Sequence, residues 1–422
     1  MRFKPFLPLS LLSAWRRADA SDASTLHKCY TRGTWHERGL LARAGLLAWL
    51  LVWWPISNLV MLAWCTAFNG PATRRRSGKA VWRQVVEQAE VAVRYSIPSP
   101  WYYIFDLWDD DKRKKAALYL NRYETKGGVY AFLKRYLGGV TSGLGDKLEF
   151  HEICLKDGLP APPLVMVLDG GEVSEGERRL PEFDLFVKPR KGRGGHGAES
   201  WAYLGKGRYR SHTGEECTET ELLSHLARLS LKQPQLVQRR LVNHPELADL
   251  TTGALTTARM MTVLNEEGEY EFTHAVFRTA AKRNSPVDNF HAGGIAAPVD
   301  PRSGELGRAM GGGLSGLSMF SDLGPRKTHP VTGAQISGRR LPFWGEAIEL
   351  VTRAHQSFPG LAAVGWDVGF TQDGLVLVEG NSAPDLDIIQ RCWQMPLGET
   401  RLAAALAFHV KRALASLPPV RR

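Results

Sequence analysis

The chain has 422 residues, enough for two or three domains, and a hydrophobic content of 44%, which allows a normal core. Its formal net charge of +11 is concentrated in residues 1–83 while the rest is nearly neutral, which argues against a folded body that binds nucleic acid. The five cysteines are far apart and include no C-x-x-C pair, which argues against a zinc site or a disulfide framework and fits a reducing compartment.

Residues 1–43 form a basic N-terminal tail. The opening "MRFKPFLPLSLLSAWRRADASDA" has the charged start, short apolar run and small residues of a signal peptide. Arg16 and Arg17 stand between the apolar run and any cleavage site, however, and this position disfavours cleavage.

Residues 44–73 contain no charged side chain. As one helix they would run ~45 Å, more than the ~30 Å of a hydrocarbon core. Four tryptophans suit a membrane interface, and Pro55 predicts a kink or break in the middle. Basic residues on both sides fit a re-entrant or in-plane segment with both ends in the cytoplasm, and they also fit a tilted single span. We expect this segment to associate with a membrane.

The next part, residues 74–145, predicts a helical region because apolar residues recur at helical spacing. Asp146 is expected to cap the following helix, which Gly158 ends. From residue 184 onward, strands alternate with glycine-rich loops and helices, and a further helix is expected over 342–358.

The stretch "DLFVKPRKGRGGHGAES" is the first that indicates chemistry. A β-prone run ends at Lys188, and the glycine-rich loop 191–197 follows. Glycines let backbone N–H groups approach phosphates closely, and a lysine supplies a point charge. The loop is not a Walker A motif, and a flexible surface loop is the alternative when it is taken alone.

The stretch "GWDVGFTQDGLVLVEGNSAPDLD" is the second that indicates chemistry. Residues 372–374 are expected to form a three-residue hairpin loop that places Asp367 opposite Glu379. Side chains alternate along a strand, so Glu379 and Asn381 share one face. A solvated edge with unrelated acids is the alternative. Three converging oxygen ligands favour a hard cation such as Mg²⁺, which would remove the repulsion between the carboxylates.

With these motifs the sequence resembles the ATP-grasp superfamily. The shared features are the lysine in "DKLEF", the lysine in "FVKP", the glycine-rich loop and the hairpin. The segments "LVQRRLVNHPEL", "DNFHAGGIAAPVD" and "HPVTG" are similar, more closely, to the sugar-transfer-associated ATP-grasp family. The resemblance covers about residues 120–400.

The resemblance implies an α+β, ATP-grasp fold, in which two α+β lobes hold ATP between them. Residues 146–230 would form the first lobe and residues 231–422 the second, which ends in a C-terminal helix. The helical region and the membrane-associated segment would precede them.

The resemblance also implies roles for residues. Lys147 and Lys188 would contact the phosphates of ATP, and Asp367, Glu379 and Asn381 would bind Mg²⁺, two ions in this superfamily. The loop that closes over the phosphates would be formed by Gly192, Gly194, Gly195, His196 and Gly197.

The strand between the lobes departs from the family pattern. Many ATP-grasp enzymes have an acidic residue where this strand meets adenine and ribose, but here the residues are Gln238, Arg239 and Arg240. Backbone groups of Arg240 and Leu241 could still hold adenine, while these residues do not mark a preference for ATP over GTP.

On the substrate side, alternation places Arg259 on the same strand face as Thr257. Arg259 and Arg278 suit a phosphate or carboxylate, and exposed strand arginines are the alternative. Asn289 lies in "DNFHAGGI", which looks like a substrate-side loop.

The reaction implied by the resemblance is activation of a carboxylate as an acyl phosphate, followed by attack of an amine or similar nucleophile. The expected setting is cell-surface polysaccharide or glycoconjugate biosynthesis at the cytoplasmic face of the cell membrane. The expected partners are a small-molecule carboxylate, an amine or sugar-linked acceptor, and the membrane surface, but no nucleic acid. Two alternatives stay open: an ATP-grasp phosphotransferase, and a non-catalytic nucleotide-binding scaffold in a glycan assembly complex.

Overall fold

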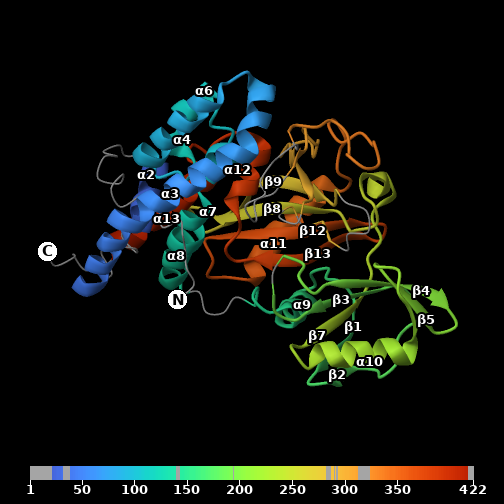
Figure 1. Ribbon diagram of the computed structural model, residues 1–422. Helices are drawn as coiled ribbons and strands as arrows, with labels where there is room; N and C mark the ends of the chain where they lie inside the picture. The colour runs from blue at the N-terminus through green and yellow to red at the C-terminus, as the bar shows by residue number, and fades with distance from the viewer. Residues whose placement is uncertain are drawn as a thin grey trace.

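The computed structural model describes residues 21–31, 39–138, 143–192, 194–281, 287–288, 290, 293–311 and 324–416. Two antiparallel sheets lie side by side, and a layer of helices covers the second sheet (Figure 1). The predicted mixed α+β class is therefore confirmed.

The first sheet has seven strands in the order β2-β1-β7-β3-β4-β5-β6. Helix α10 (Glu219–Ser230) packs on it, and its first turn is closed by a capping box between Thr218 and Glu221. β7 lies between β1 and β3, although the sequence-based boundary after residue 230 assigned it to the second lobe. The strands are β1 (Leu164–Asp169), β2 (Glu172–Gly176), β3 (Leu185–Pro189), β4 (Glu199–Gly205), β5 (Arg208–Ser211), β6 (Glu216–Thr218) and β7 (Gln235–Arg239).

The second sheet has six strands in the order β11-β10-β9-β8-β12-β13. One face packs on α11 (Trp344–Ser357), and the short helix η4 (Pro245–Leu250) joins the same core. The other face packs on the helical layer. The strands are β8 (Thr257–Leu264), β9 (Tyr270–Thr279), β10 (Ile295–Val299), β11 (Met310–Gly311), β12 (Ala363–Thr371) and β13 (Gly374–Asn381).

Helix α9 (Lys147–Lys156) connects the two lobes. Asp146 caps it as expected, since its carboxylate accepts from the N–H groups of Leu148 and Glu149. Leu148 packs on the first sheet, whereas Phe150 stacks on Phe358 of the second core with ring centroids 5.4 Å apart. The helix therefore fixes how its own first residue, Lys147, is placed between the lobes.

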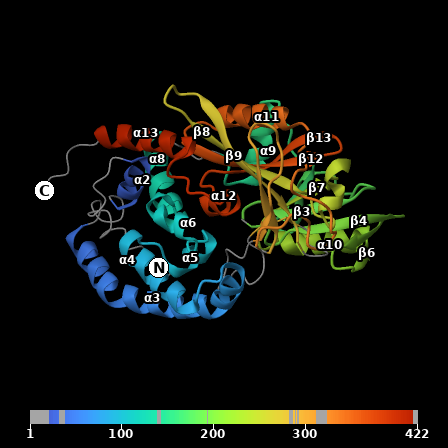
Figure 2. The same cartoon turned by 90° about the horizontal axis from the view of Figure 1, so that it is seen from above.

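The helical layer contains both N-terminal and C-terminal helices (Figure 2). A fully buried ion pair joins the two sets, with Arg391 Nη1 2.9 Å from Asp106 Oδ1. The helices are α2 (Asp22–Thr31), α3 (Leu40–Ser77), α4 (Val81–Tyr95), α5 (Ser99–Ile104), α6 (Asp110–Lys114), η2 (Ala116–Leu118), α7 (Arg122–Glu124), the π-helical η3 (Thr125–Val129), α8 (Tyr130–Tyr136), α12 (Leu386–Trp393) and α13 (Arg401–Ala415).

Helix α3 is continuous over 38 residues, so of the predicted kink or break at Pro55 the break is absent. The side chains of Ser57 and Asn58 donate to Trp54 O in the turn that follows Pro55. Figure 2 shows the helix curving along the outside of the layer. Among the described residues, α3 is the helix that by length and composition could cross a membrane.

The predicted hairpin forms, but with a shorter loop. Thr371 pairs with Gly374, which leaves two loop residues rather than three, and Gly374 has the positive φ of 113°. The register then shifts between Asp367 and Val368, so β13 contains one extra residue. This bulge restores the expected pairing of Asp367 with Glu379, which is confirmed.

Candidate active site

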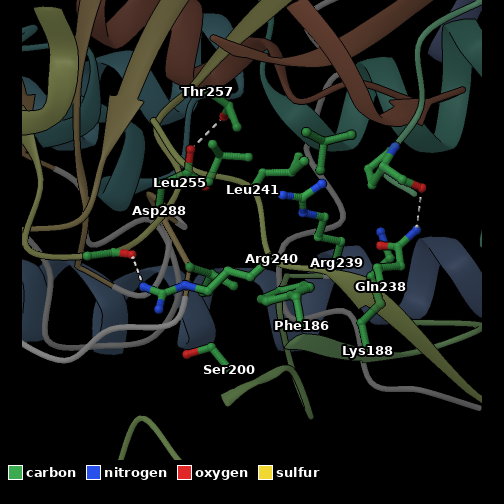
Figure 3. A pocket seen from close by; sticks show the side chains of 14 residues that line it. Phe186, Lys188, Ser200, Gln238, Arg239, Arg240, Leu241, Leu255, Thr257 and Asp288 are labelled. Carbon is green, nitrogen blue, oxygen red and sulfur yellow. Dashed lines mark hydrogen bonds between the residues drawn. The ribbon is translucent and has the colours of Figure 1, made fainter. Parts of the chain in front are cut away.

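A pocket opens between the two sheets (Figure 3). The space in the pocket that no atom fills is ≈ 640 Å³, and part of this space is open to solvent. Four predicted nucleotide-binding residues line it, namely Lys188, Gln238, Arg240 and Leu241. The other lining residues are Pro162, Phe186, Ser200, Arg239, Gly253, Leu255, Thr257, Val287, Asp288 and Val378.

Lys188 is the buried cation of this pocket. Its side chain lies at the end of β3, where alternation places it on the same face as Phe186. Burial lowers the pKa of Lys188 to about 8. The negative charge of Glu379 opposes this shift, and the positive charge of Lys147 adds to it. Among the described residues no group accepts a hydrogen bond from its ammonium, so a bound anion would be a favourable partner.

Lys147 comes from a different element, the first turn of α9. Its ammonium donates to Gly192 O at 3.0 Å, so it contacts the glycine-rich loop directly. Burial lowers its pKa as well, against the opposing charges of Glu379 and Asp146. Both lysines therefore interact electrostatically with Glu379 of the second lobe.

The glycine-rich loop is exposed and needs its glycines. Gly192, Gly194, Gly195 and Gly197 all have positive φ values, between 72° and 143°. A Cβ at Gly195 would lie 2.8 Å from Val287, which lines the pocket. The loop thus approaches the second lobe where only glycine fits, and His196 on it is exposed.

The segment that follows β7, where the chain leaves the first sheet, offers backbone groups rather than side chains. Arg240 donates its backbone N–H to Asp184 O at 2.9 Å, and its guanidinium bonds Asp184 and Gly253 O. The Gln238 amide donates to Pro162 O at 3.4 Å. In the described parts of the chain, the Arg240 carbonyl and the Leu241 N–H have no partner, so these are the two groups that could hold a base.

Arg259 and Arg278 lie in one charge network rather than on an exposed edge. Both bind Asp367, Arg259 through two nitrogens and Arg278 through Nη2 at 3.0 Å. Arg278 also contacts Thr257 Oγ1 at 2.6 Å, and the Thr257 hydroxyl donates to Asp288 at 2.5 Å. Two arginines and two aspartates therefore balance one another beside the pocket.

The protonation of this network follows from its pairing. Burial alone would raise the pKa of Asp367, but Arg259 and Arg278 hold it below its usual range. Burial raises the pKa of Asp288 despite the nearby Arg278. Asp367 is thus held as the carboxylate, with its oxygens already engaged by two guanidinium groups.

The three predicted metal ligands differ in their availability. Glu379 pairs with Asp367 and Asn381 with Gly365, so both point to the face that carries the arginines. No described group donates to the side chains of Glu379 or Asn381. Their oxygens are of the kind that Mg²⁺ prefers and are free to bind it, whereas Asp367 would have to share its oxygens with arginine.

Several lining residues were not predicted. Asp288 and Val378 are separated along the chain and reach the pocket through a loop and through the bulge in β13, and no local pattern marks either. Phe186 could have been found from the alternation that selects Lys188. The predicted Asn289 lies outside the described residues.

Three solved structures are similar in fold but distant in sequence. The ADP complex of N5-carboxyaminoimidazole synthetase from Staphylococcus aureus is 11% identical, with a TM-score of 0.30, over 58% of this chain and 45% of that one. L-amino acid ligase from Bacillus licheniformis is 11% identical, with a TM-score of 0.34, over 64% and 48%. D-alanyl-alanine synthetase A from Vibrio cholerae is 11% identical, with a TM-score of 0.37, over 65% and 66%. The chain thus spans about half the length of the first two proteins. All three TM-scores are below 0.5, so no reaction is inferred from these structures.

A search of the curated proteins found no match. The family model described as sugar-transfer associated ATP-grasp matches residues 135–401, which include both sheets, the pocket and the hairpin. Because this match covers more than half of the 422 residues, the chain belongs to the sugar-transfer associated ATP-grasp family.

Proposed function

We propose that the protein is an ATP- and Mg²⁺-dependent ligase that joins a carboxylate to an amine or similar nucleophile. The observation that carries the proposal is that Lys188 lines the pocket between the lobes without an accepting group among the described residues, while Lys147 donates to Gly192 O of the glycine-rich loop at 3.0 Å. The acidic charge of Glu379 in the second lobe acts on the pKa of both lysines. Two cations and a facing acidic residue are what a nucleoside triphosphate and its metal need.

ATP would lie with its base against the segment that follows β7 and its phosphates toward the lysines. The Arg240 carbonyl would accept from the base and the Leu241 N–H would donate to it. Lys188 would gain an anionic partner, and Lys147 would link the phosphates to the loop that it already contacts at Gly192. Closure of this loop would exclude water from the reacting groups.

Glu379 and Asn381 would hold Mg²⁺, with Asp367 as a third ligand. The ion would supply Lewis-acid stabilisation of charge on the phosphate oxygens. For Asp367 to take part, Arg259 or Arg278 would release one carboxylate oxygen, and the released guanidinium would then face the anionic substrate.

The reaction proceeds in two steps. A carboxylate oxygen attacks the γ-phosphorus, and the bond from the γ-phosphorus to the bridging β-phosphate oxygen breaks. The products of this step are ADP and an acyl phosphate. The amine nitrogen then attacks the acyl carbon and phosphate departs, so that the carboxylate, the ammonium and ATP yield an amide, ADP, phosphate and one proton. The chain's residues position these groups and offset their charge.

The setting is also part of the proposal. The family name points to sugar transfer, and α3 is long and apolar enough to associate with a membrane. We place the catalytic body at the cytoplasmic face of the cell membrane, where ATP is available, with a sugar-linked acceptor in polysaccharide or glycoconjugate biosynthesis.

The test is a screen of ATP turnover by the full-length protein in detergent, with amino acids and sugar acids as carboxylates and amino sugars as acceptors. The ligase predicts ADP and free phosphate in equal amounts, formed only when both substrates are present. ADP with a stable phosphorylated product and no free phosphate would instead identify a phosphotransferase, and nucleotide binding without turnover of any pair would favour a scaffold.

A single variant tests the metal-binding role. Glu379→Gln removes the charge but not the shape, and we expect turnover to fall at least ~100-fold because several kcal/mol of charge stabilisation are lost. The thermal unfolding midpoint should stay near that of the parent. Glu172→Gln is the matched control, because Glu172 is exposed on the edge strand β2. Full activity of Glu379→Gln would contradict the assignment.

A further inference from the structure

Helices α3 and α4 carry an unusual concentration of exposed apolar side chains. Fourteen of the nineteen exposed large hydrophobic side chains in the described parts of the chain lie on these two helices. Surfaces of this kind mark interaction sites. On α3 they are Leu40, Leu41, Leu47, Leu51, Val52, Trp53, Ile56, Leu59, Val60, Trp64 and Phe68, and on α4 they are Trp82, Val86 and Val93.

The polarity of α4 is inverted relative to a helix of a soluble protein. Its buried face includes Gln84, Glu87 and Gln88, while Trp82, Val86 and Val93 are 65%, 58% and 57% exposed. These three positions lie on one side of the helix by their spacing. A soluble domain would place its apolar stripe inside, so the outer face of α4 is built for an apolar environment.

The same inversion holds for the second half of α3. Thr66, Asn69 and Thr73 are buried, whereas Trp64 and Phe68 are 40% and 48% exposed. Buried residues recur along one side of the helix from Leu50 to Thr73. From Ser57 to Thr73 the helix therefore lies along the protein and presents its other side outward, whereas residues 40–56 are exposed on most sides.

Hydrogen bonds fix this orientation. The Gln88 amide donates to Thr66 Oγ1 at 2.9 Å and to Tyr103 OH at 3.2 Å, and the Gln84 amide donates to Gly70 O at 3.2 Å. The Tyr103 hydroxyl in turn donates to Gln84 Oε1 at 3.1 Å. Rotating either helix would break several buried polar contacts, so the apolar sides of α3 and α4 remain together on the outside.

The charges on this surface favour a lipid partner. Helix α3 contains no acidic residue, and the exposed Arg74, Arg75 and Arg76 lie at its end. On α4, Glu87 is buried and Glu90 is paired with Arg94 at 2.8 Å. An apolar face with tryptophans and a basic border matches the interface of a bilayer that contains anionic lipids.

We propose that α3 and α4 together form one membrane-binding face that lies in the plane of the bilayer, half embedded in a single leaflet. The inference rests on the membrane association proposed above and decides its form, since protein covers one side of α4 and of the C-terminal half of α3, whereas a helix that spans alone would have lipid on all sides. It also adds α4, which is too short and too polar in composition to be recognised as a membrane element.

The first experiment measures which residues enter the lipid. Cys217 is the native cysteine that is not buried, so the full-length protein carries Cys217→Ser. One accessible cysteine is then introduced, Val86→Cys or Val93→Cys, labelled with an environment-sensitive fluorophore and mixed with phosphatidylcholine–phosphatidylglycerol vesicles. We expect emission to rise and to be quenched by brominated lipids. Leu155→Cys and Leu231→Cys are matched controls, 62% and 68% exposed away from this face, and should not respond. An unresponsive Val86 label on vesicle-bound protein would overturn the role of α4.

The second experiment measures the contribution to binding. The double variant Val86→Glu/Val93→Glu should bind the same vesicles at least ~10-fold more weakly, while Leu155→Glu/Leu231→Glu should bind as the parent does. If membranes that contain protein shield the label at position 86 but vesicles of pure lipid do not, the partner of this face is a protein and the proposal is overturned. These assays contain no nucleotide, so failure of the proposed ligase reaction would leave their outcome unchanged.

The third experiment separates an in-plane helix from a span. Cysteines at Leu40→Cys and Ser77→Cys, both at exposed ends of α3, are treated with a membrane-impermeant maleimide in inverted membrane vesicles. The proposal predicts labelling of both from the cytoplasmic side. Labelling of the Ser77→Cys protein alone would show that α3 crosses the membrane and would overturn it.

Discussion

At the scale of single residues, Lys188 shows how a buried charge prepares a binding site. Its ammonium is buried without an accepting group in the described parts of the chain, and burial lowers its pKa to about 8. A depressed lysine pKa means that the fold disfavours the charged form, so folding is penalised below pH 8 and this penalty disappears as the pH rises. A bound phosphate would reverse the preference by supplying the missing partner.

The pH dependence of nucleotide binding follows from this. Below about pH 8 Lys188 carries its charge and affinity should be constant. Above it the free protein loses the proton that the complex keeps, so Kd should rise by up to ~10-fold per pH unit and binding should take up protons. Calorimetry in two buffers of different ionisation enthalpy measures both Kd and the number of protons taken up on binding. Lys188→Arg keeps its charge at these pH values, so its Kd should depend less on pH, and an equally steep dependence in this variant would exclude Lys188 as the source.

At the scale of elements, the contact between α2 and η3 depends on one glycine. A Cβ at Gly128 would lie 2.5 Å from Tyr30 Cδ2 and 3.1 Å from Tyr30 Cα, so backbone would have to move. At the neighbouring Gly127 a Cβ would meet nothing within 4 Å. The two glycines of one π-helical turn therefore differ in what surrounds them.

Gly128→Ala should lower the free energy of unfolding by about 1–3 kcal/mol, because the added methyl group overpacks this contact. Gly127→Ala is the matched control and should be neutral or slightly stabilising, since alanine favours helical backbone over glycine. Denaturant unfolding of both variants, monitored by far-ultraviolet circular dichroism, checks the difference. Equal stability of the two variants would mean that α2 does not pack on η3 as described.

At the scale of the whole molecule, the helical layer belongs to the second lobe. Arg391 of α12 is 2% exposed, and its guanidinium binds Asp106 and the carbonyls of Tyr103 and Ile104 at the end of α5. The Trp101 indole donates to Asp387 at 2.9 Å, beside the start of α12. Residues nearly 300 positions apart thus close one core, which connects the proposed membrane-binding face to the chain that follows the hairpin.

Arg391→Met should destabilise the protein by about 3–5 kcal/mol, because Asp106 would stay buried without its nearest cation, and the remaining Lys112 is 4.0 Å away. The double variant Asp106→Asn/Arg391→Met should recover part of this loss, since the buried negative charge of Asp106 is removed together with the positive charge of Arg391. Thermal unfolding of the three proteins in detergent gives the comparison. A single variant as stable as the parent would show that the layer is only loosely attached to the lobe.

The sequence by itself determined the elements whose signals are local. The strand that carries Lys188 and the cap at Asp146 follow from alternation and capping within a few residues. The fold class was predicted through the resemblance to the ATP-grasp superfamily, which rests on short and specific motifs.

Only the tertiary structure decided which distant groups meet. It placed Arg259 and Arg278 on Asp367, brought Asp288 to the pocket, and turned the polar sides of α3 and α4 inward. These outcomes depend on the packing of elements separated along the chain, which no local pattern encodes. The shorter hairpin loop shows the same limit at small scale, since a bulge in β13 compensates for it and leaves the paired acids where a longer loop would have placed them.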